Sequence, residues 1–180
     1  MSRKNKGLTL VELAVVMALL ALLAVLSFSS VKSWLAAYQA ERETKVVLSF
    51  LSQARLRALQ EKKKFFVAFG SRTLTLYEDT DQDGSFDAAT DQKAETLNLK
   101  YEITWNGGNG VLPVTERGTF DLYGAGAPGG KTLCWRTVEN PSLARARPST
   151  DCLYISFVQV RPGKLQDPAG VCNKDNCQGK

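Results

Sequence analysis

An uninterrupted apolar run near the N-terminus constrains this chain more than any other feature. Residues 13–26 read LAVVMALLALLAVL and contain no polar side chain, and weakly polar flanks extend the run from Leu8 to Val31. As an α-helix, these 24 residues are long enough to cross a hydrocarbon layer of about 30 Å. A secretory signal peptide is the rival interpretation, but no small-x-small cleavage site follows the run at the appropriate place. The sequence therefore predicts a membrane-spanning segment over residues 8–31.

The helical pattern continues beyond this run. Apolar side chains recur at intervals of three and four residues from Trp34 to Ala58, basic residues lie between them, and no proline occurs before Pro113. We expect one helix from about residue 8 to residue 62, apolar in its first half and amphipathic in its second. At about 1.5 Å per residue it would be roughly 80 Å long, which exceeds an ordinary globular helix.

After the helix, the pattern changes to that of β-strands. Residues 65–69 and 73–77 are rich in β-branched and aromatic side chains and are separated by Gly70-Ser71-Arg72, which predicts a hairpin. Glycine-rich loops separate the further expected strands, which are residues 96–105, 118–123, 132–138 and 153–160. The fold class is α+β, with the long N-terminal helix packed on an antiparallel β-sandwich-like domain of about six or seven strands. The expected divisions are residues 1–7, 8–63 and 64–180.

Composition argues against an enzyme. The chain has 23 Lys and Arg against 18 Asp and Glu, but Arg3, Lys4 and Lys6 precede the apolar run, so much of the positive excess belongs to an N-terminal leader. Histidine is absent, which removes the commonest general base and metal ligand. Since no pairing of a nucleophile with a base is evident either, we expect a non-catalytic protein.

Four cysteines lie in the last third of the chain, at Cys134, Cys152, Cys172 and Cys177. An even, clustered set downstream of an export segment indicates two disulfides in an oxidising compartment, and four reduced, buried thiols are the alternative. Of the three possible connectivities, we expect Cys134 with Cys152, joining neighbouring strands, and Cys172 with Cys177, closing a short loop.

The stretch KGLTLVEL at residues 6–13 closely resembles the prepilin signal of type IV pilins and type II secretion pseudopilins. In that family a prepilin peptidase cuts after the glycine, methylates the new N-terminus and leaves glutamate as the fifth mature residue. Gly7, Leu8 and Glu12 match these positions, although phenylalanine or methionine is usual where Leu8 stands. The resemblance implies that the Glu12 carboxylate, costly beside an apolar helix unless paired, pairs with the α-amino group of a neighbouring subunit. A position at the lipid headgroups is the alternative for Glu12.

Residues 118–124 and 158–165 resemble, less specifically, the GspH/FimT group of minor pilins, whose members pack a long helix on a β-sandwich. Some members associated with DNA uptake end in Gly-Arg-x-Arg, whereas the corresponding residues here are Gly163-Lys164-Leu165-Gln166. A basic patch that contacts phosphates is still conceivable, but no aromatic side chains are interleaved to stack bases, so DNA is the less expected partner. The residues of such a patch would be Arg136, Arg145, Arg147, Arg161 and Lys164.

Residues 79–87 read DTDQDGSFD, which has the spacing of an EF-hand-type calcium loop with glycine sixth and an acid ninth. The expected calcium ligands are Asp79, Asp81, Asp83 and Asp87. Thr90 occupies the twelfth position, where an EF-hand has a bidentate glutamate, and Asp87 or Asp91 could substitute for it. A plain polar turn is the alternative to a calcium site.

Together these features predict a minor pilin or pseudopilin that assembles into a type IV pilus through its N-terminal helix. The alternatives are an H-type subunit of the type II secretion pseudopilus and a tip subunit that binds DNA or another ligand. Expected partners are the prepilin peptidase, other pilins or pseudopilins, the inner-membrane assembly platform and membrane lipid. The expected location is the inner membrane, crossed once, with the C-terminal domain in the periplasm or outside the cell.

Overall fold

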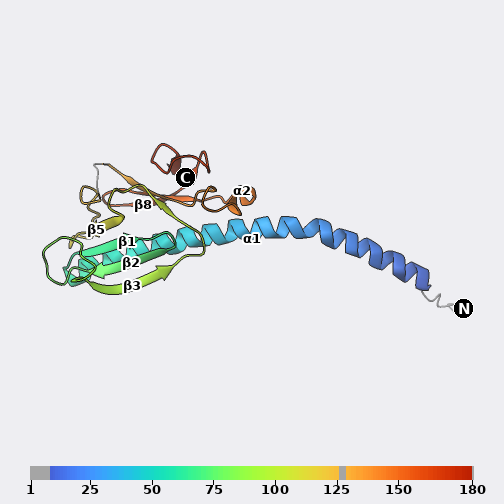
Figure 1. Cartoon of the computed structure of the whole chain (residues 1–180), viewed down its shortest axis with the longest axis horizontal. Coiled ribbons are helices and arrows are strands. Elements are labelled where there is room, and N and C mark those ends of the chain that lie inside the picture. Colours follow the sequence, from blue (N-terminus) through green and yellow to red (C-terminus); the bar gives the residue numbers. More distant parts are fainter. Residues whose placement is uncertain (1–8, 126–128, 180) are drawn as a thin grey trace, which may run out of the picture.

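A computed structural model describes residues 9–125 and 129–179, apart from the side chains of residues 25–30. One long helix, α1 (Leu10–Glu61), extends from a domain of two antiparallel sheets that packs against its C-terminal half (Figure 1). The N-terminal half of α1 projects away from the domain, and the C-terminus lies with the sheets. The α+β class and the long helix packed on a two-sheet domain are therefore confirmed.

Helix α1 is continuous because its sequence contains neither proline nor glycine between its two caps. Thr9 caps its start, since the Thr9 Oγ1 accepts a hydrogen bond from the backbone N–H of Glu12 at 3.3 Å. The helix ends at Lys62, which has a left-handed backbone with φ of 55°. The 52 residues correspond to a length of roughly 78 Å.

The first sheet has the strand order β3-β2-β1-β5. Its centre is the expected hairpin, in which β1 (Phe65–Phe69) and β2 (Thr73–Glu78) pair antiparallel with Phe65 opposite Glu78. β3 (Gln92–Asn98) forms one edge beside β2, and β5 (Val111–Val114) forms the other edge beside β1.

The second sheet has the order β4-β6-β7-β8-β9. A short helix, α2 (Leu143–Ala146), follows β6 and precedes β7 along the chain, and it contacts α1. The strands of this sheet are β4 (Thr104–Trp105), β6 (Lys131–Cys134), β7 (Cys152–Ile155), β8 (Val160–Leu165) and β9 (Cys177–Gly179).

Several expected strands are wrong in their extent. Residues 96–105 do not form one strand, because the chain leaves β3 after Asn98 and enters the other sheet at β4. Residues 153–160 are divided by a turn in which the backbone N–H of Ser156 donates to the Gln159 oxygen, so they belong to β7 and β8. Residues 132–138 leave the ladder after Cys134.

Residues 118–123 do not form a strand, apart from a single bridge between Val114 and Phe120. Gly118, with φ of 68°, ends a turn in which its N–H donates to the Thr115 oxygen, and a Cβ there would lie 2.6 Å from the Leu59 side chain of α1. The segment is therefore shaped by its close approach to the helix, a contact that β-propensity does not report.

The core lies between α1 and the two sheets. Alternation along each strand decides which side chains enter it: Phe65 and Val67 of β1 face α1, whereas Phe66 lies outside this core and packs against Phe86. α1 contributes one buried stripe at three- and four-residue spacing. The stripe consists of Ala40, Val47, Phe50, Leu51, Ala54 and Ala58, each at most 5% exposed.

Candidate functional site

The N-terminal segment carries the first candidate residues. Gly7 and Leu8, the expected cleavage site, lie outside the described residues. Beyond Thr9, the part of α1 that projects from the domain, residues 10–35, is here called the free half. Where its side chains are described, the apolar ones are exposed rather than covered by another element. Among those described, the following are at least 45% exposed: Leu10, Val11, Leu13, Val15, Val16, Met17, Leu19, Leu20, Leu22 and Leu23.

The free half is apolar around its circumference rather than on one stripe. Exposed apolar side chains occur at successive positions such as Val15, Val16 and Met17, so they point in different directions around the helix axis. Among the described residues, no helix provides an apolar stretch of sufficient length to cross a membrane.

Glu12 is the acidic residue of this apolar segment. Its backbone N–H is satisfied by Thr9, and its side chain is exposed. Within residues 9–125 and 129–179, no group pairs with its carboxylate. A carboxylate surrounded by exposed leucine and valine is stable only in water or with a cationic partner, so any burial of this helix requires a partner for Glu12.

The apolar surface continues along α1 to the point where the helix meets the domain. Trp34 and Tyr38 stack with ring centroids 6.0 Å apart and are 68% and 56% exposed. Along the packed half of α1, Val46 and Leu56 are also exposed on the side away from the core. The sheets therefore cover one side of α1 and leave the other side open.

Glu43, which the sequence analysis did not single out, attaches α1 to both sheets. Its Oε1 accepts a hydrogen bond from the Lys100 backbone N–H at 2.5 Å, and its Oε2 accepts from the Tyr101 N–H and the Trp135 Nε1, each at 3.3 Å. These bonds hold the chain where it passes from β3 to β4. Burial, followed by the Glu43 charge, raises the pKa of the Tyr101 phenol. A lone acid in a helical pattern carries no sequence signal of such long-range contacts.

The four cysteines form two disulfides, but the expected pairing is wrong. The bonds join Cys134 to Cys172 and Cys152 to Cys177. Cys134 and Cys152 are indeed opposite each other on β6 and β7, as the expected pairing assumed. However, the residues beside them, Leu133 and Leu153, face α1, so both cysteines point to the opposite face of the sheet.

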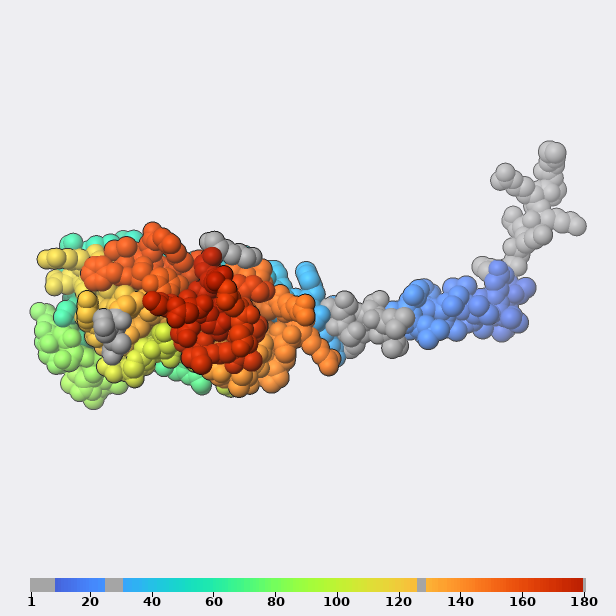
Figure 2. All heavy atoms as spheres, turned by 90° about the horizontal axis from the view of Figure 1, so that it is seen from above, coloured from blue at the N-terminus to red at the C-terminus, as the bar shows by residue number. Residues whose placement is uncertain are grey.

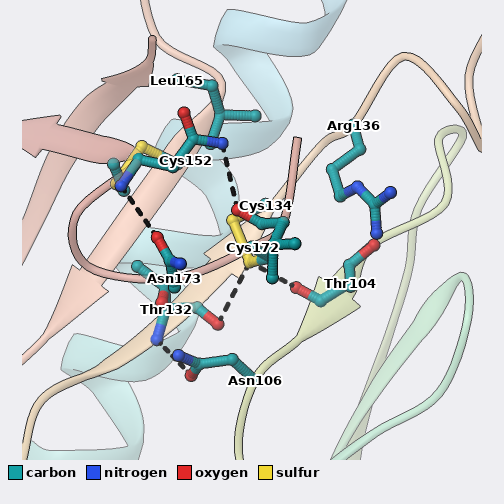
Figure 3. The surroundings of a disulfide bond; sticks show 12 residues. Thr104, Asn106, Thr132, Cys134, Arg136, Cys152, Leu165, Cys172 and Asn173 are labelled. Atoms are coloured by element: carbon teal, nitrogen blue, oxygen red, sulfur yellow. Dashed lines mark hydrogen bonds between the residues drawn. A yellow bond between two sulfur atoms is a disulfide. The ribbon is translucent and has the colours of Figure 1, made fainter. Parts of the chain in front are cut away.

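That opposite face is covered by the C-terminal segment, residues 166–179, which supplies the other two cysteines (Figure 2). With Leu165, all four cysteines form a second, smaller buried cluster. Figure 3 shows Cys172 between the oxygens of Thr104 and Thr132, with its Sγ 3.3 Å from the Thr104 oxygen. As a disulfide sulfur it has no proton to donate, so this is a packing contact. The two bonds hold the C-terminal segment to the sheet at two points.

The loop between β2 and β3, residues 79–91, is here called the acidic loop. The structure brings Asp79 and Asp81 together with Asp91, and each of the three offers a carboxylate oxygen within 4.8 Å of the others. Asp83 and Asp87 are not members of this cluster. Instead, the Asp83 Oδ1 accepts from the Ser85 N–H at 2.7 Å, and the Asp87 Oδ1 accepts from the Ala89 N–H at 2.9 Å. Burial raises the pKa of Asp79, and hydrogen bonds from backbone N–H groups partly offset this.

The basic residues of the suggested DNA patch mostly contact the domain itself. Arg136 pairs with Glu139 at 3.4 Å, the Arg161 Nε donates to the Gln159 Oε1 at 2.9 Å, and the Lys164 Nζ donates to the Pro148 oxygen at 2.7 Å. Arg147 and Lys164 line one cavity of about 420 Å³, whereas Arg161 lines another. These contacts favour structural roles for the three basic side chains.

Comparison with known proteins yields one match. Residues 2–28 match the family described as the prokaryotic N-terminal methylation motif. No curated protein and no solved structure matches the chain. The matched residues include Gly7, Leu8, Glu12 and most of the apolar run, which are the features that the sequence analysis singled out. Over residues 2–28 the chain thus carries the N-terminal methylation motif, which is the prepilin signal of type IV pilins and pseudopilins.

Proposed function

We propose that this chain is a minor subunit of a type IV pilus that enters the filament through the free half of α1. The observation that carries the proposal is the combination of an exposed, all-round apolar helix with one carboxylate, Glu12, that has no partner among the described residues. Such a surface needs a covering layer that the described residues do not supply. Lipid covers it in the membrane through residues 8–31, and neighbouring helices cover it in the filament.

Assembly requires a positively charged partner for Glu12 when the helix leaves the membrane for the filament. Cleavage after Gly7 exposes an α-amino group at Leu8, and this group of one subunit pairs with the Glu12 carboxylate of the next. An ion pair in an apolar environment costs several kcal/mol to break by removing one partner. The pair therefore sets the axial position of each new subunit as well as stabilising it.

The role is structural rather than catalytic. The chain has no histidine, which is the commonest general base. The pilus is preferred to the type II secretion pseudopilus because two disulfides secure the outer face of the domain, as suits a subunit exposed to the medium. Resemblance to the GspH/FimT group supports the assignment as a minor subunit.

The test is replacement of Glu12 in the full-length protein expressed in its own host. Glu12→Gln keeps the size of the side chain and removes its charge, so the variant is expected to accumulate in the membrane at the normal level but to be at least tenfold depleted from sheared filaments. Glu61→Gln, at the exposed C-terminal end of the same helix, is the matched control and is expected to assemble normally. Normal incorporation of Glu12→Gln would overturn the proposed pairing.

The choice of machine is tested by deleting the gene. Loss of surface pili with normal secretion of exoproteins would support the pilus, and the reverse result would assign the chain to a secretion pseudopilus.

A further inference from the structure

The base of the acidic loop holds carboxylates that the fold itself forces together. β2 and β3 pair antiparallel, with Glu78 opposite Gln92 as the last pair of the ladder. Asp79 and Asp91 are the next residues outward on the two strands, so the register places them side by side where the loop begins and ends. Asp79 is 2% exposed and Asp91 is 6% exposed. Two acids are thus buried at the closing point of one loop.

Each of these two carboxylates has one satisfied and one unsatisfied oxygen. The Asp79 Oδ2 accepts from the Gly84 N–H at 3.1 Å, and the Asp91 Oδ2 accepts from the Asp87 N–H at 2.9 Å. The Oδ1 atoms of both are buried and have no hydrogen-bond partner among the described residues. Burying a carboxylate oxygen without a partner is unfavourable, and two neighbouring negative charges add repulsion.

Within the described part of the chain, no basic side chain forms an ion pair with these acids, although the Lys64 Nζ lies close to Gly84 of the same loop. Lys62, Lys63 and Lys64 line a polar cavity of about 460 Å³ that also reaches Asp79, but none of them forms an ion pair with Asp79, Asp81 or Asp91. Lys63 pairs with Glu78 instead. A cation bound from solution would neutralise the three acids directly.

We propose that Asp79, Asp81 and Asp91 bind one calcium ion at the base of the acidic loop. The donors are all oxygens, and the chain offers neither histidine nor a free cysteine, which disfavours zinc and other borderline or soft metals. Calcium binds oxygens at about 2.3–2.6 Å, so oxygens up to 4.8 Å apart fit around a single ion, whereas magnesium demands about 2.0–2.1 Å and octahedral geometry. Asp81 is exposed, and water completes the coordination on its side.

The ligand set differs from that of an EF-hand. Asp83 and Asp87 shape the loop by accepting hydrogen bonds from the backbone two residues onward, while the distant Asp91 supplies the third carboxylate through strand pairing. Phe86 anchors the middle of the loop, with its ring centroid 5.7 Å from that of Phe66 and 5.1 Å from that of Tyr77. The loop is therefore largely shaped before the ion arrives. With three carboxylates and nearby lysines, we expect a dissociation constant of roughly 10⁻⁴ to 10⁻³ M.

Calcium would stabilise the adjacent edge of the first sheet. β3 is an edge strand with exposed side chains at Gln92, Lys93 and Ala94, and its register to β2 shifts between Leu76 and Tyr77, close to the loop. Drawing Asp79 and Asp91 onto one ion closes the ladder at this weak end. Amide exchange in β3 should therefore slow when calcium binds.

The experiment uses the full-length protein in detergent micelles, titrated calorimetrically with calcium chloride and, separately, with magnesium chloride. Wild type is expected to bind calcium in the stated range, to melt at a higher temperature with calcium than with chelator, and to show slower exchange in β3. Asp81→Ala should lose at least tenfold in affinity, whereas Asp83→Ala, a matched exposed acid of the same loop, should stay within about twofold.

A second variant guards against a simple folding defect. Asp91→Asn keeps the hydrogen bond from Asp87 but removes one of the buried charges, so it should raise the melting temperature of the calcium-free protein and abolish the response to calcium. The proposal is overturned if wild type shows no response at about 10 mM calcium. It is also overturned if Asp83→Ala is as defective as Asp81→Ala, or if magnesium acts equally well at equal concentration.

Discussion

The Glu43 side chain makes the main polar contacts between α1 and the two sheets. Glu43→Ala leaves the backbone N–H groups of Lys100 and Tyr101 and the Trp135 indole without their acceptor. Because an unsatisfied buried donor costs about 1–3 kcal/mol, we expect a loss of about 2 kcal/mol or more in the free energy of unfolding, measured by urea denaturation. Glu61→Ala should change it by less than about 0.5 kcal/mol. Equal stability of the two variants would contradict this role.

Asp151 makes stability depend on pH. Burial raises its pKa, while a hydrogen bond from the Leu165 N–H at 2.5 Å and the charge of Lys164 act in the opposite direction. The folded state therefore holds this proton more tightly than the unfolded state. The ionised form lowers stability above the folded pKa, and this penalty disappears as the pH falls toward the ordinary aspartate value of about 4.

Asp151→Asn retains an acceptor for Leu165 and removes the charge. We expect a higher free energy of unfolding near neutral pH and a flatter pH profile between the folded pKa and about pH 4. The other charged residues that line the same cavity, Arg147, Lys164 and Asp167, are unchanged in this variant. The control is Asp175→Asn, which removes the charge of an acid outside that cavity. Parallel profiles for wild type and Asp151→Asn would refute the assignment.

At the scale of elements, the disulfides fix the C-terminal segment rather than the strands to which it is attached. Replacing both Cys152 and Cys177 by alanine opens a loop of 25 residues, and we expect the free energy of unfolding to fall by about 3 kcal/mol. Limited proteolysis should cut residues 166–179 first, and only fragments that contain Cys172 should stay attached through the Cys134–Cys172 bond. Peptide mapping without reduction that found Cys134 joined to Cys152 would contradict the structure.

The elements that could be predicted from the sequence are those with local causes. The β1–β2 hairpin follows from alternating side chains around Gly70-Ser71-Arg72, and α1 follows from its apolar period and the lack of breakers. Residues 96–105 could not be predicted as two strands, because the division depends on Glu43, more than fifty positions earlier. The predicted disulfide pairing was wrong for a similar reason, because no spacing rule reveals that residues 166–179 fold back over β6 and β7.

The acidic loop could be predicted from the sequence only in part. The D-x-D-x-D-G spacing correctly pointed to Asp79 and Asp81 as neighbours in one cluster. The pattern offered Asp83 and Asp87 as the further ligands, with Asp87 or Asp91 as the substitute at the twelfth position, because an EF-hand takes its ligands from within one curled loop. Here Asp91 enters from the far strand, and that contact follows from the register of β2 with β3.

At the scale of the whole molecule, processing decides whether the free half of α1 can be used. We expect the mature protein to begin at a methylated Leu8, because the uncut leader would retain Arg3, Lys4 and Lys6 and leave no α-amino group for Glu12. Mass spectrometry of the N-terminal peptide from filaments checks this. Gly7→Val places a branched side chain at the scissile bond and should leave the protein uncut and absent from filaments. An intact Met1 terminus in assembled wild type would contradict the expectation.

The buried stripe of α1 also has a mechanical consequence. From Ala40 to Ala58 the helix lies along the domain for roughly 27 Å, and tension applied to its free half is directed along this contact. The packed side chains are then loaded in shear, all at once, rather than peeled apart one after another. Since every cysteine lies beyond residue 133, no disulfide joins the helix to the sheets. The non-covalent contact between α1 and the sheets would therefore be the first to resist a pulling force. The part of the domain cross-linked by Cys134–Cys172 and Cys152–Cys177 would be the last to extend.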